Sequence, residues 1–135
     1  MIRNAIFAFG VIMAVPFSAS AGPDCGLYQY RAEVTEVYDG DTVTVDIDLG
    51  FDVWMKDQKL RLYGIDAPEM RGPEKPDGTI SRDALRDKIL DEEVMLCSYK
   101  DEKGKFGRYL ATIWLNDLDV NRWLVEEGYA VPYLP

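Results

Sequence analysis

Histidine is absent from the sequence of 135 residues. This absence excludes Ser-His-Asp and Cys-His catalytic sites, histidine general bases and the common histidine-containing zinc and transition-metal sites. Cations that prefer oxygen ligands remain available, and carboxylate and guanidinium groups can assist them. The sequence therefore favours hard-cation chemistry.

Basic residues are scarce relative to acidic ones, with 15 Lys and Arg against 24 Asp and Glu and a formal net charge of -9. Most nucleic-acid-binding domains are basic. A chain of this charge can act on a polyanion where a cation and a few arginines reverse the sign locally, but it lacks long-range attraction. The surplus of carboxylates is also typical of a soluble secreted protein.

No apolar run is long enough to span a bilayer comfortably. The longest covers residues 5–17 and precedes an Ala-Ser-Ala sequence at 19–21, the small-x-small pattern of a signal-peptidase site. We therefore predict a signal peptide at residues 1–21 and one mature domain at residues 22–135, located in the periplasm or secreted. Retention of the N-terminal segment as a membrane anchor is the alternative.

Only two cysteines occur, and both follow the predicted cleavage site. An exported protein meets an oxidising compartment, in which disulfides persist. A bridge between Cys25 and Cys97 is therefore one interpretation. Two unpaired thiols in the core are the other, because two cysteines alone do not establish a bridge.

Alternating apolar and polar residues predict a three-stranded antiparallel meander. The first strand covers residues 28–38 and ends at an Asp-Gly hairpin signal. The second covers residues 42–48, and the third covers residues 59–65, after a loop at 50–57. A proline then ends the third strand, and residues 70–78 have the composition of a mobile loop.

The rest of the chain predicts a helix, two strands and a short final helix. The first helix covers residues 80–90, with Thr79 or Ser81 as its N-cap. The strands cover residues 94–99 and 109–115. The final helix is expected to start at Asn121 as its cap and to run through Glu127, before Gly128. The predicted order of these elements is helix, strand, strand, helix.

This order predicts a mainly β fold, a five-stranded OB-fold Greek-key barrel with one helix between strands 3 and 4 and a short C-terminal helix. In that topology the first strand lies antiparallel to the fourth. The residues before the first strand then approach the fourth, so Cys25 can reach Cys97.

The meander also brings carboxylates together. The second strand leaves the Asp-Gly turn that contains Asp41, and the third returns to the same end of the sheet, where Asp66 follows it. Two carboxylates beside the carbonyl of Ala67, with Glu69 at the edge, make a sparse oxygen site suited to Ca²⁺ and several waters. An EF-hand is excluded, because its glycine position holds Thr44. A purely structural turn is the alternative reading of the Asp-Gly sequence.

Four sequence stretches, in order, resemble the motifs of the staphylococcal nuclease (thermonuclease) family. They span most of the predicted mature domain, and several motifs that must agree in order are far more specific than one. The stretches are DGDT at 39–42, RLYGIDAPE at 61–69, KFGR at 105–108, and VN at 120–121 with GYA at 128–130.

The resemblance implies the metal ligands. Asp41 and Asp66 match the carboxylates that bind Ca²⁺ in the family, and Ala67 matches the position that offers its backbone carbonyl. The expected cofactor is therefore Ca²⁺. A secreted domain that Ca²⁺ merely stabilises is a rival interpretation, but it does not require two arginines near the metal.

The resemblance also implies the catalytic residues. Arg61 and Arg108 match the arginines that hold the scissile phosphate, and forked donors suit this task. Glu69 matches the residue assigned as the general base for the attacking water, or as the group that positions it. These groups suit in-line hydrolysis of a phosphodiester.

Substrate binding is expected at Lys105, Phe106 and Tyr133. Phe106 departs from the tyrosine of many relatives and keeps a ring that can stack on a base; Tyr133 either stacks on a base or packs against the barrel. We expect an exported, monomeric, Ca²⁺-dependent endonuclease that hydrolyses DNA and RNA and contacts no membrane once the signal peptide is removed. A non-catalytic OB-fold module that binds nucleic acid or protein is the alternative.

Overall fold

The computed structural model describes residues 10, 14, 25–103 and 106–134. Nearly all of the predicted signal peptide (residues 1–21) lies outside these ranges, as does Lys105. No helix in the described part of the chain is long and apolar enough to cross a bilayer.

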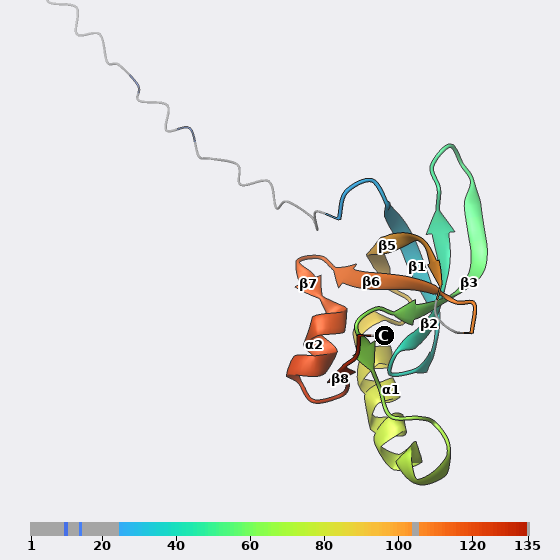
Figure 1. Cartoon of the computed structure of the whole chain (residues 1–135). Coiled ribbons are helices and arrows are strands. Elements are labelled where there is room, and N and C mark those ends of the chain that lie inside the picture. The colour runs from blue at the N-terminus through green and yellow to red at the C-terminus, as the bar shows by residue number, and fades with distance from the viewer. Residues whose placement is uncertain (1–9, 11–13, 15–24, 104–105, 135) are drawn as a thin grey trace, which may run out of the picture.

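Five strands close into a barrel (Figure 1). Neighbours in the order β3-β2-β1-β5-β6 are antiparallel, and a parallel pairing of β3 with β6 completes the circle. The closing pair joins Leu60–Leu62 of β3 to Tyr109–Ala111 of β6. The predicted five-stranded OB-type barrel is thereby confirmed. Its strands are β1 (Gln29–Asp39), β2 (Thr42–Asp48), β3 (Trp54–Leu62), β5 (Glu93–Lys103) and β6 (Tyr109–Leu115).

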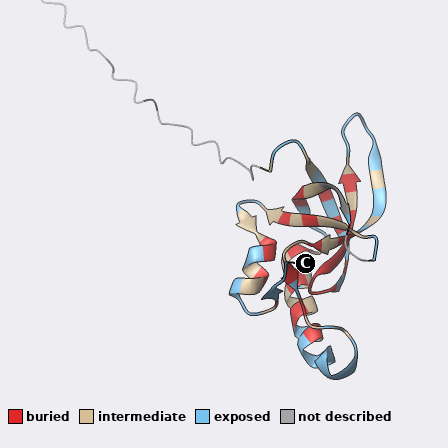
Figure 2. Ribbon diagram, in the orientation of Figure 1, coloured by how far each residue is buried: buried red, intermediate tan, exposed pale blue. Residues whose placement is uncertain are grey.

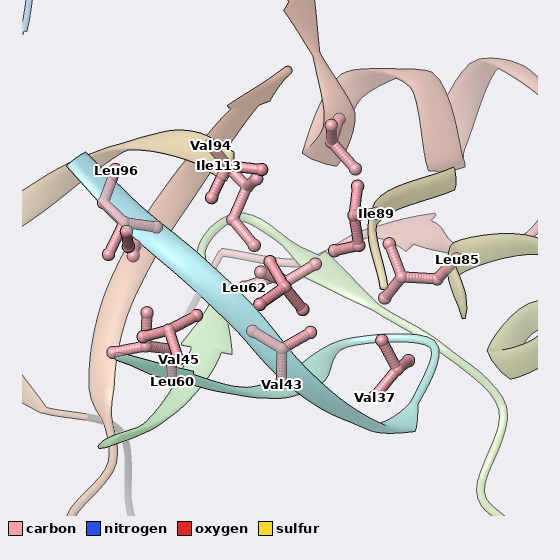
Figure 3. Close-up of a cluster of buried hydrophobic side chains, with 14 of the residues drawn as sticks. Val37, Val43, Val45, Leu60, Leu62, Leu85, Ile89, Val94, Leu96 and Ile113 are labelled. Carbon is pink, nitrogen blue, oxygen red and sulfur yellow. The ribbon is translucent and has the colours of Figure 1, made fainter. Parts of the chain in front are cut away.

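The core fills the barrel and the space between the barrel and α1 (Lys75–Ile89). Figure 2 shows the buried positions on the strands and along α1. The buried apolar residues extend from Ala32 to Ala130, so residues 25–134 contain one complete core. Figure 3 shows its side chains pointing toward one another: Val37, Val43, Val45, Leu60, Leu62, Leu85, Ile89, Val94, Leu96 and Ile113.

The third strand begins earlier than predicted. It starts at Trp54, and Asp48 of β2 pairs with Trp54 while Ile47 pairs with Met55. Most positions of this segment are exposed, so no apolar alternation marks it as a strand in the sequence. Backbone pairing and the contacts of Asp46 with Lys56 and Asp57 extend the ladder, and the β2–β3 hairpin projects beyond the barrel (Figure 1).

The first helix also begins earlier than predicted. The loop expected at 70–78 contains a 3₁₀ turn, Gly72–Glu74, that leads directly into α1. Neither Thr79 nor Ser81 is its N-cap. Pro76 lies in the first turn of α1, where its missing N–H removes no helical hydrogen bond. A residue that usually ends helices therefore starts this one.

Helix α2 (Val120–Glu126) is capped by Asp119 rather than by the predicted Asn121. The Asp119 carboxylate accepts a hydrogen bond from the backbone N–H of Arg122 at 3.0 Å. Gly128, with a φ of 79°, follows the end of the helix as predicted.

Asn121 is buried and joins three segments of backbone instead. Its side-chain oxygen accepts from the N–H of Ile113 at 3.1 Å. Its amide nitrogen donates to the carbonyls of Tyr63 at 3.0 Å and Ala111 at 3.1 Å. Asn121 thus holds α2 against β6 and against the turn that follows β3.

Short pairings and one covalent bond complete the fold. A disulfide joins Cys25 to Cys97 with a Cα separation of 5.7 Å, because β1 and β5 pair antiparallel, with Gln29 opposite Cys97. The predicted bridge is confirmed, and the unpaired alternative is wrong. The remaining strands are β4 (Ile65–Asp66), which pairs with β8 (Val131–Pro132), and β7 (Leu118–Asp119), which pairs with β6.

Candidate functional site

A cleft of about 790 Å³ lies where the β1–β2 turn, the end of β3, and the segments around β4 and β8 meet. It gathers residues that are far apart in the sequence. Every predicted catalytic residue lines it, together with both predicted metal carboxylates and two of the three predicted substrate-binding residues: Asp41, Arg61, Asp66, Glu69, Phe106, Arg108 and Tyr133.

The β1–β2 turn holds Asp41 inside the protein, with 6% of its surface exposed. Its backbone N–H donates to the Asp39 carboxylate at 3.0 Å, and its own Oδ2 accepts from the N–H of Ala67 at 2.8 Å. Gly40 allows this approach, since a Cβ there would lie 2.7 Å from the Cβ of Ala67 and 2.8 Å from that of Ser81. The glycine thus brings the turn against the chain that carries Asp66.

Arg61 connects the two carboxylates. Its Nη1 lies 2.7 Å from Asp41 Oδ2, and its Nη2 donates to Asp66 Oδ1 at 3.0 Å. The strand pairing explains the contact, because Arg61 lies opposite Thr42 and the N–H of Leu62 donates to the carbonyl of Asp41 at 2.8 Å. Only 14% of the Arg61 side chain is exposed, so the ion pair with Asp41 is shielded from water.

The charge on Asp41 is only partly compensated. Burial, and then repulsion from Asp39, raises the pKa of Asp41 from 3.8 to about 7. The N–H of Ala67 and the guanidinium of Arg61 lower this pKa but do not cancel the increase. The anionic form of Asp41 is therefore unfavourable in its buried position, even beside Arg61.

Arg108 approaches the same turn from the start of β6. Its Nη1 donates to Thr42 Oγ1 at 2.8 Å, and that hydroxyl lies 3.2 Å from Asp41 Oδ1. Its guanidinium lies 5.3 Å from the ring centre of Phe106, within range of a cation–π interaction. Among the described residues, Arg108 Nε is the one buried side-chain polar atom without a hydrogen-bond partner. This guanidinium therefore keeps one unused hydrogen-bond donor.

Glu69 and Tyr133 lie at the margins of the cleft. The Glu69 side chain is exposed, and its backbone N–H donates to the Glu74 carboxylate at 3.2 Å. Gly78 lets α1 pack against this backbone, because a Cβ on Gly78 would overlap the carbonyl of Glu69. Tyr133 is 50% exposed, and its N–H donates to Gly64 at 2.8 Å. The Tyr133 ring is thus presented to the cleft by the backbone beside it.

The donor set suits a hard cation. In the described part of the chain, no three Cys, Asp or Glu side chains are placed to hold a metal by themselves. The available donors are the carboxylate oxygens of Asp41 and Asp66, both of which contact Arg61. Sparse oxygen ligation completed by water is typical of Ca²⁺ and Mg²⁺. The contact of Ala67 in this structure is made by its N–H rather than by its carbonyl.

Sequence reasoning missed two members of this network, Asp39 and Thr42. Both flank the Asp-Gly turn, and Thr42 is the link through which Arg108 reaches the Asp41 carboxylate. Their position in the sequence, close to Asp41, was the one signal that could have identified them as site residues. An Asp and a Thr at a hairpin turn are, however, common for structural reasons alone.

Comparisons with known proteins agree with this geometry. The profile of the family described as staphylococcal nuclease homologue matches residues 59–134. A thermonuclease of Staphylococcus hyicus is 33% identical over 128 residues, covering 89% of this chain and 72% of that protein. A thermonuclease of Staphylococcus intermedius is 34% identical over 100 residues, covering 72% of this chain and 56% of that protein. The chain therefore belongs to the staphylococcal nuclease family of phosphodiester-hydrolysing enzymes.

Proposed function

We propose that this nuclease is an exported, Ca²⁺-dependent enzyme that cuts both DNA and RNA. One observation carries the proposal: Arg61 and Arg108 are joined through Asp41 and Thr42 at a single cleft. A barrel of this kind has no structural need for two guanidiniums beside buried carboxylates. A site that binds a phosphodiester needs both.

Asp41 and Asp66 would hold the cation, with the carbonyl of Ala67 as a third ligand. The oxygen donors support this assignment, and a cation beside Asp41 would stabilise the anionic form of its buried carboxyl. When bound, Ca²⁺ supplies positive charge that neutralises the phosphate and polarises a water molecule. Because Arg61 contacts both carboxylates in the structure, cation binding is expected to release its guanidinium for the substrate.

The side chains of the chain itself then perform distinct tasks. Arg61 and Arg108 donate to the non-bridging oxygens of the phosphate and stabilise the charge that grows on them during in-line attack. Glu69 accepts a proton from, or orients, the water whose oxygen bonds to phosphorus. The opposite P–O bond breaks, and the leaving oxygen takes a proton from solvent. The rings of Phe106 and Tyr133, with Lys105, bind the adjoining nucleotide.

Both DNA and RNA are proposed as substrates because these groups contact features that the two polymers share. Arginines bind the phosphate, and exposed rings stack on any base face. None of the proposed roles requires a ribose 2′-hydroxyl, which is the group that distinguishes RNA from DNA. Single-stranded substrate is expected to be preferred, since stacking on an exposed ring requires an unpaired base.

The direct test incubates the purified chain with single-stranded DNA and with RNA, first with Ca²⁺ and then with excess chelator. We expect cleavage of both polymers with Ca²⁺ and none with chelator. Retained binding without any cleavage would contradict the proposal and would favour a non-catalytic OB-fold module.

Export is tested separately. A host that secretes the full-length chain should yield periplasmic or extracellular protein with Gly22 as its first residue. Recovery of uncleaved chain in the membrane fraction would instead favour the N-terminal anchor.

A further inference from the structure

The cleft continues along the sheet, away from the carboxylate cluster. Glu36, Tyr38, Thr44 and Lys59 line it in addition to the residues already described. Glu36 of β1 pairs with Thr44 of β2, and Thr44 pairs with Lys59 of β3. These three residues therefore form a row across the sheet, next to the row that contains Thr42 and Arg61. Nothing in the predicted site uses this second row.

The spacing of the two rows fits a polymer. Lys59 precedes Arg61 by two residues on β3, so both side chains project from the same face of the strand, about 6.6–6.8 Å apart. This separation is comparable with that between successive phosphates along an extended single strand. Lys59 is exposed, and an exposed ammonium suits a phosphate as a point charge.

Tyr38 supplies an aromatic surface at this end of the cleft. Its side chain is 62% exposed, although it lies one residue before the buried Asp39. A large ring kept in water beside a reaction centre favours a stacking partner over a core role. Phe106 lies in the β5–β6 turn and Tyr133 follows β8, whereas Tyr38 belongs to β1; all three rings are exposed.

We propose that Tyr38, Lys59 and Glu36 form a second nucleotide subsite, which holds the nucleotide one phosphate away from the scissile bond. This inference rests on the proposed nuclease function and deepens it. Tyr38 stacks on the base, and Lys59 binds its neighbouring phosphate. The Glu36 carboxylate accepts a hydrogen bond from a base amino group, such as that of cytosine, and disfavours thymine, which presents a carbonyl oxygen there.

The test compares an oligonucleotide with a one-nucleotide substrate. Steady-state rates are measured with a single-stranded hexanucleotide and with p-nitrophenyl esters of single nucleotides that place the nucleoside on either side of the phosphate. For Tyr38→Ala we expect KM for the hexanucleotide to rise about tenfold, as loss of one stacked base implies. In the same Tyr38→Ala variant, KM should not change for at least one of the two p-nitrophenyl esters, because a single nucleoside cannot occupy both sides of the phosphate. Tyr38→Phe keeps the ring and should keep the original KM.

Two further variants separate the roles of the other residues. Lys59→Ala should reduce the slope of log(kcat/KM) against log[salt] by about 0.7, the contribution of one phosphate on a single strand. Wild type should favour oligo-dC over oligo-dT, and Glu36→Gln should reduce that preference, because an amide can both donate and accept.

A matched control is Phe51→Ala, which removes a fully exposed ring that does not line the cleft. It should leave every one of these constants unchanged. If Tyr38→Ala leaves KM for the hexanucleotide unchanged, or raises KM equally for all substrates, the subsite is wrong although the nuclease stands. If wild type cleaves none of the substrates with Ca²⁺, the proposed function itself fails.

Discussion

The two ends of the β2–β3 hairpin differ sharply in how their side chains are used. At the cleft end, Thr42 and Arg61 face each other in a network of hydrogen bonds and ion pairs. At the other end, four large apolar side chains are exposed: Leu49, Phe51, Val53 and Trp54. Figure 2 shows this tip as pale blue where the barrel below it is largely buried.

Backbone geometry reinforces the contrast. Phe51 and Asp52 both have positive φ, at 53° and 61°, in a tight turn closed by a hydrogen bond from the N–H of Val53 to the carbonyl of Gly50 at 3.0 Å. Non-glycine residues rarely adopt this conformation. One hairpin thus combines a tightly determined functional end with a tip that contributes little to the core. Substitutions should therefore have large effects at one end and small effects at the other.

The largest effect is expected for Arg108. Arg108→Lys keeps the charge but loses the forked donors, so it should reduce kcat/KM strongly. Arg108→Ala should raise the activation free energy of phosphodiester hydrolysis by about 3–5 kcal/mol, comparable with loss of a central electrostatic stabiliser. The measurement is kcat/KM on single-stranded DNA with Ca²⁺. Phe51→Ala serves as the tip control. Equal losses of kcat/KM in Arg108→Ala and Phe51→Ala would contradict the contrast between the two ends of the hairpin.

Asn121 supports the cleft end from behind. Asn121→Ala removes three buried hydrogen bonds and leaves the N–H of Ile113 and the carbonyls of Tyr63 and Ala111 without this partner. The free energy of unfolding should fall by about 3 kcal/mol or more. Urea denaturation measures it. An unchanged midpoint would show that water replaces the side chain without cost.

Asp41 should make stability depend on pH when divalent ions are removed. Its folded pKa is raised from 3.8 to about 7, so the folded state binds the proton more tightly than the unfolded state does. The contribution of Asp41 to stability is therefore fully present below pH 3.8 and is lost as the pH rises through the folded pKa of about 7. Between pH 5 and pH 8 the loss should be roughly 2–3 kcal/mol, given 1.36 kcal/mol per pKa unit.

The control for this prediction is Asp41→Asn, studied by denaturation in chelator at the same pH values. The neutral amide removes the titrating group, so this part of the pH dependence should disappear. Parallel curves for wild type and variant would contradict the assignment to Asp41.

The smallest effect is expected at the tip, and it should be favourable. Replacing Phe51 and Asp52 by Asn and Gly supplies residues that adopt positive φ readily. Stability should rise by about 1 kcal/mol, because relief of the positive-φ strain exceeds the entropic cost of the added glycine. Nuclease activity should not change. A loss of activity would show that the tip takes part in function and would overturn the contrast between the two ends.

The sequence predicted the parts of the fold that local patterns determine. Alternation of Val43, Val45 and Ile47 indicated β2, and the return of β3 to the same end of the sheet indicated that Asp41 and Asp66 approach each other. The disulfide followed from the strand order. These features depend on periodicity and topology, which a sequence records directly.

The features that the sequence did not reveal depend on tertiary contacts. Gly78 was the last residue of the predicted loop, but it lies in α1, where the helix packs on the backbone of Glu69. Asn121 looked like a helix cap, although its partners are distant segments of backbone. The early start of β3 is supported by backbone pairing and by the contacts of Asp46 with Lys56 and Asp57. None of these partners can be identified from neighbouring residues alone.

The bond between Cys25 and Cys97 spans 72 positions and ties the first described segment of the barrel to β5. A crosslink over such a long loop chiefly limits the freedom of the unfolded chain. The same polypeptide should therefore be weakly stable while its thiols are reduced and robust once they are oxidised. If the protein is exported, this property would delay its maturation until it has left the cell interior, where an active nuclease would endanger the host's own genome and transcripts.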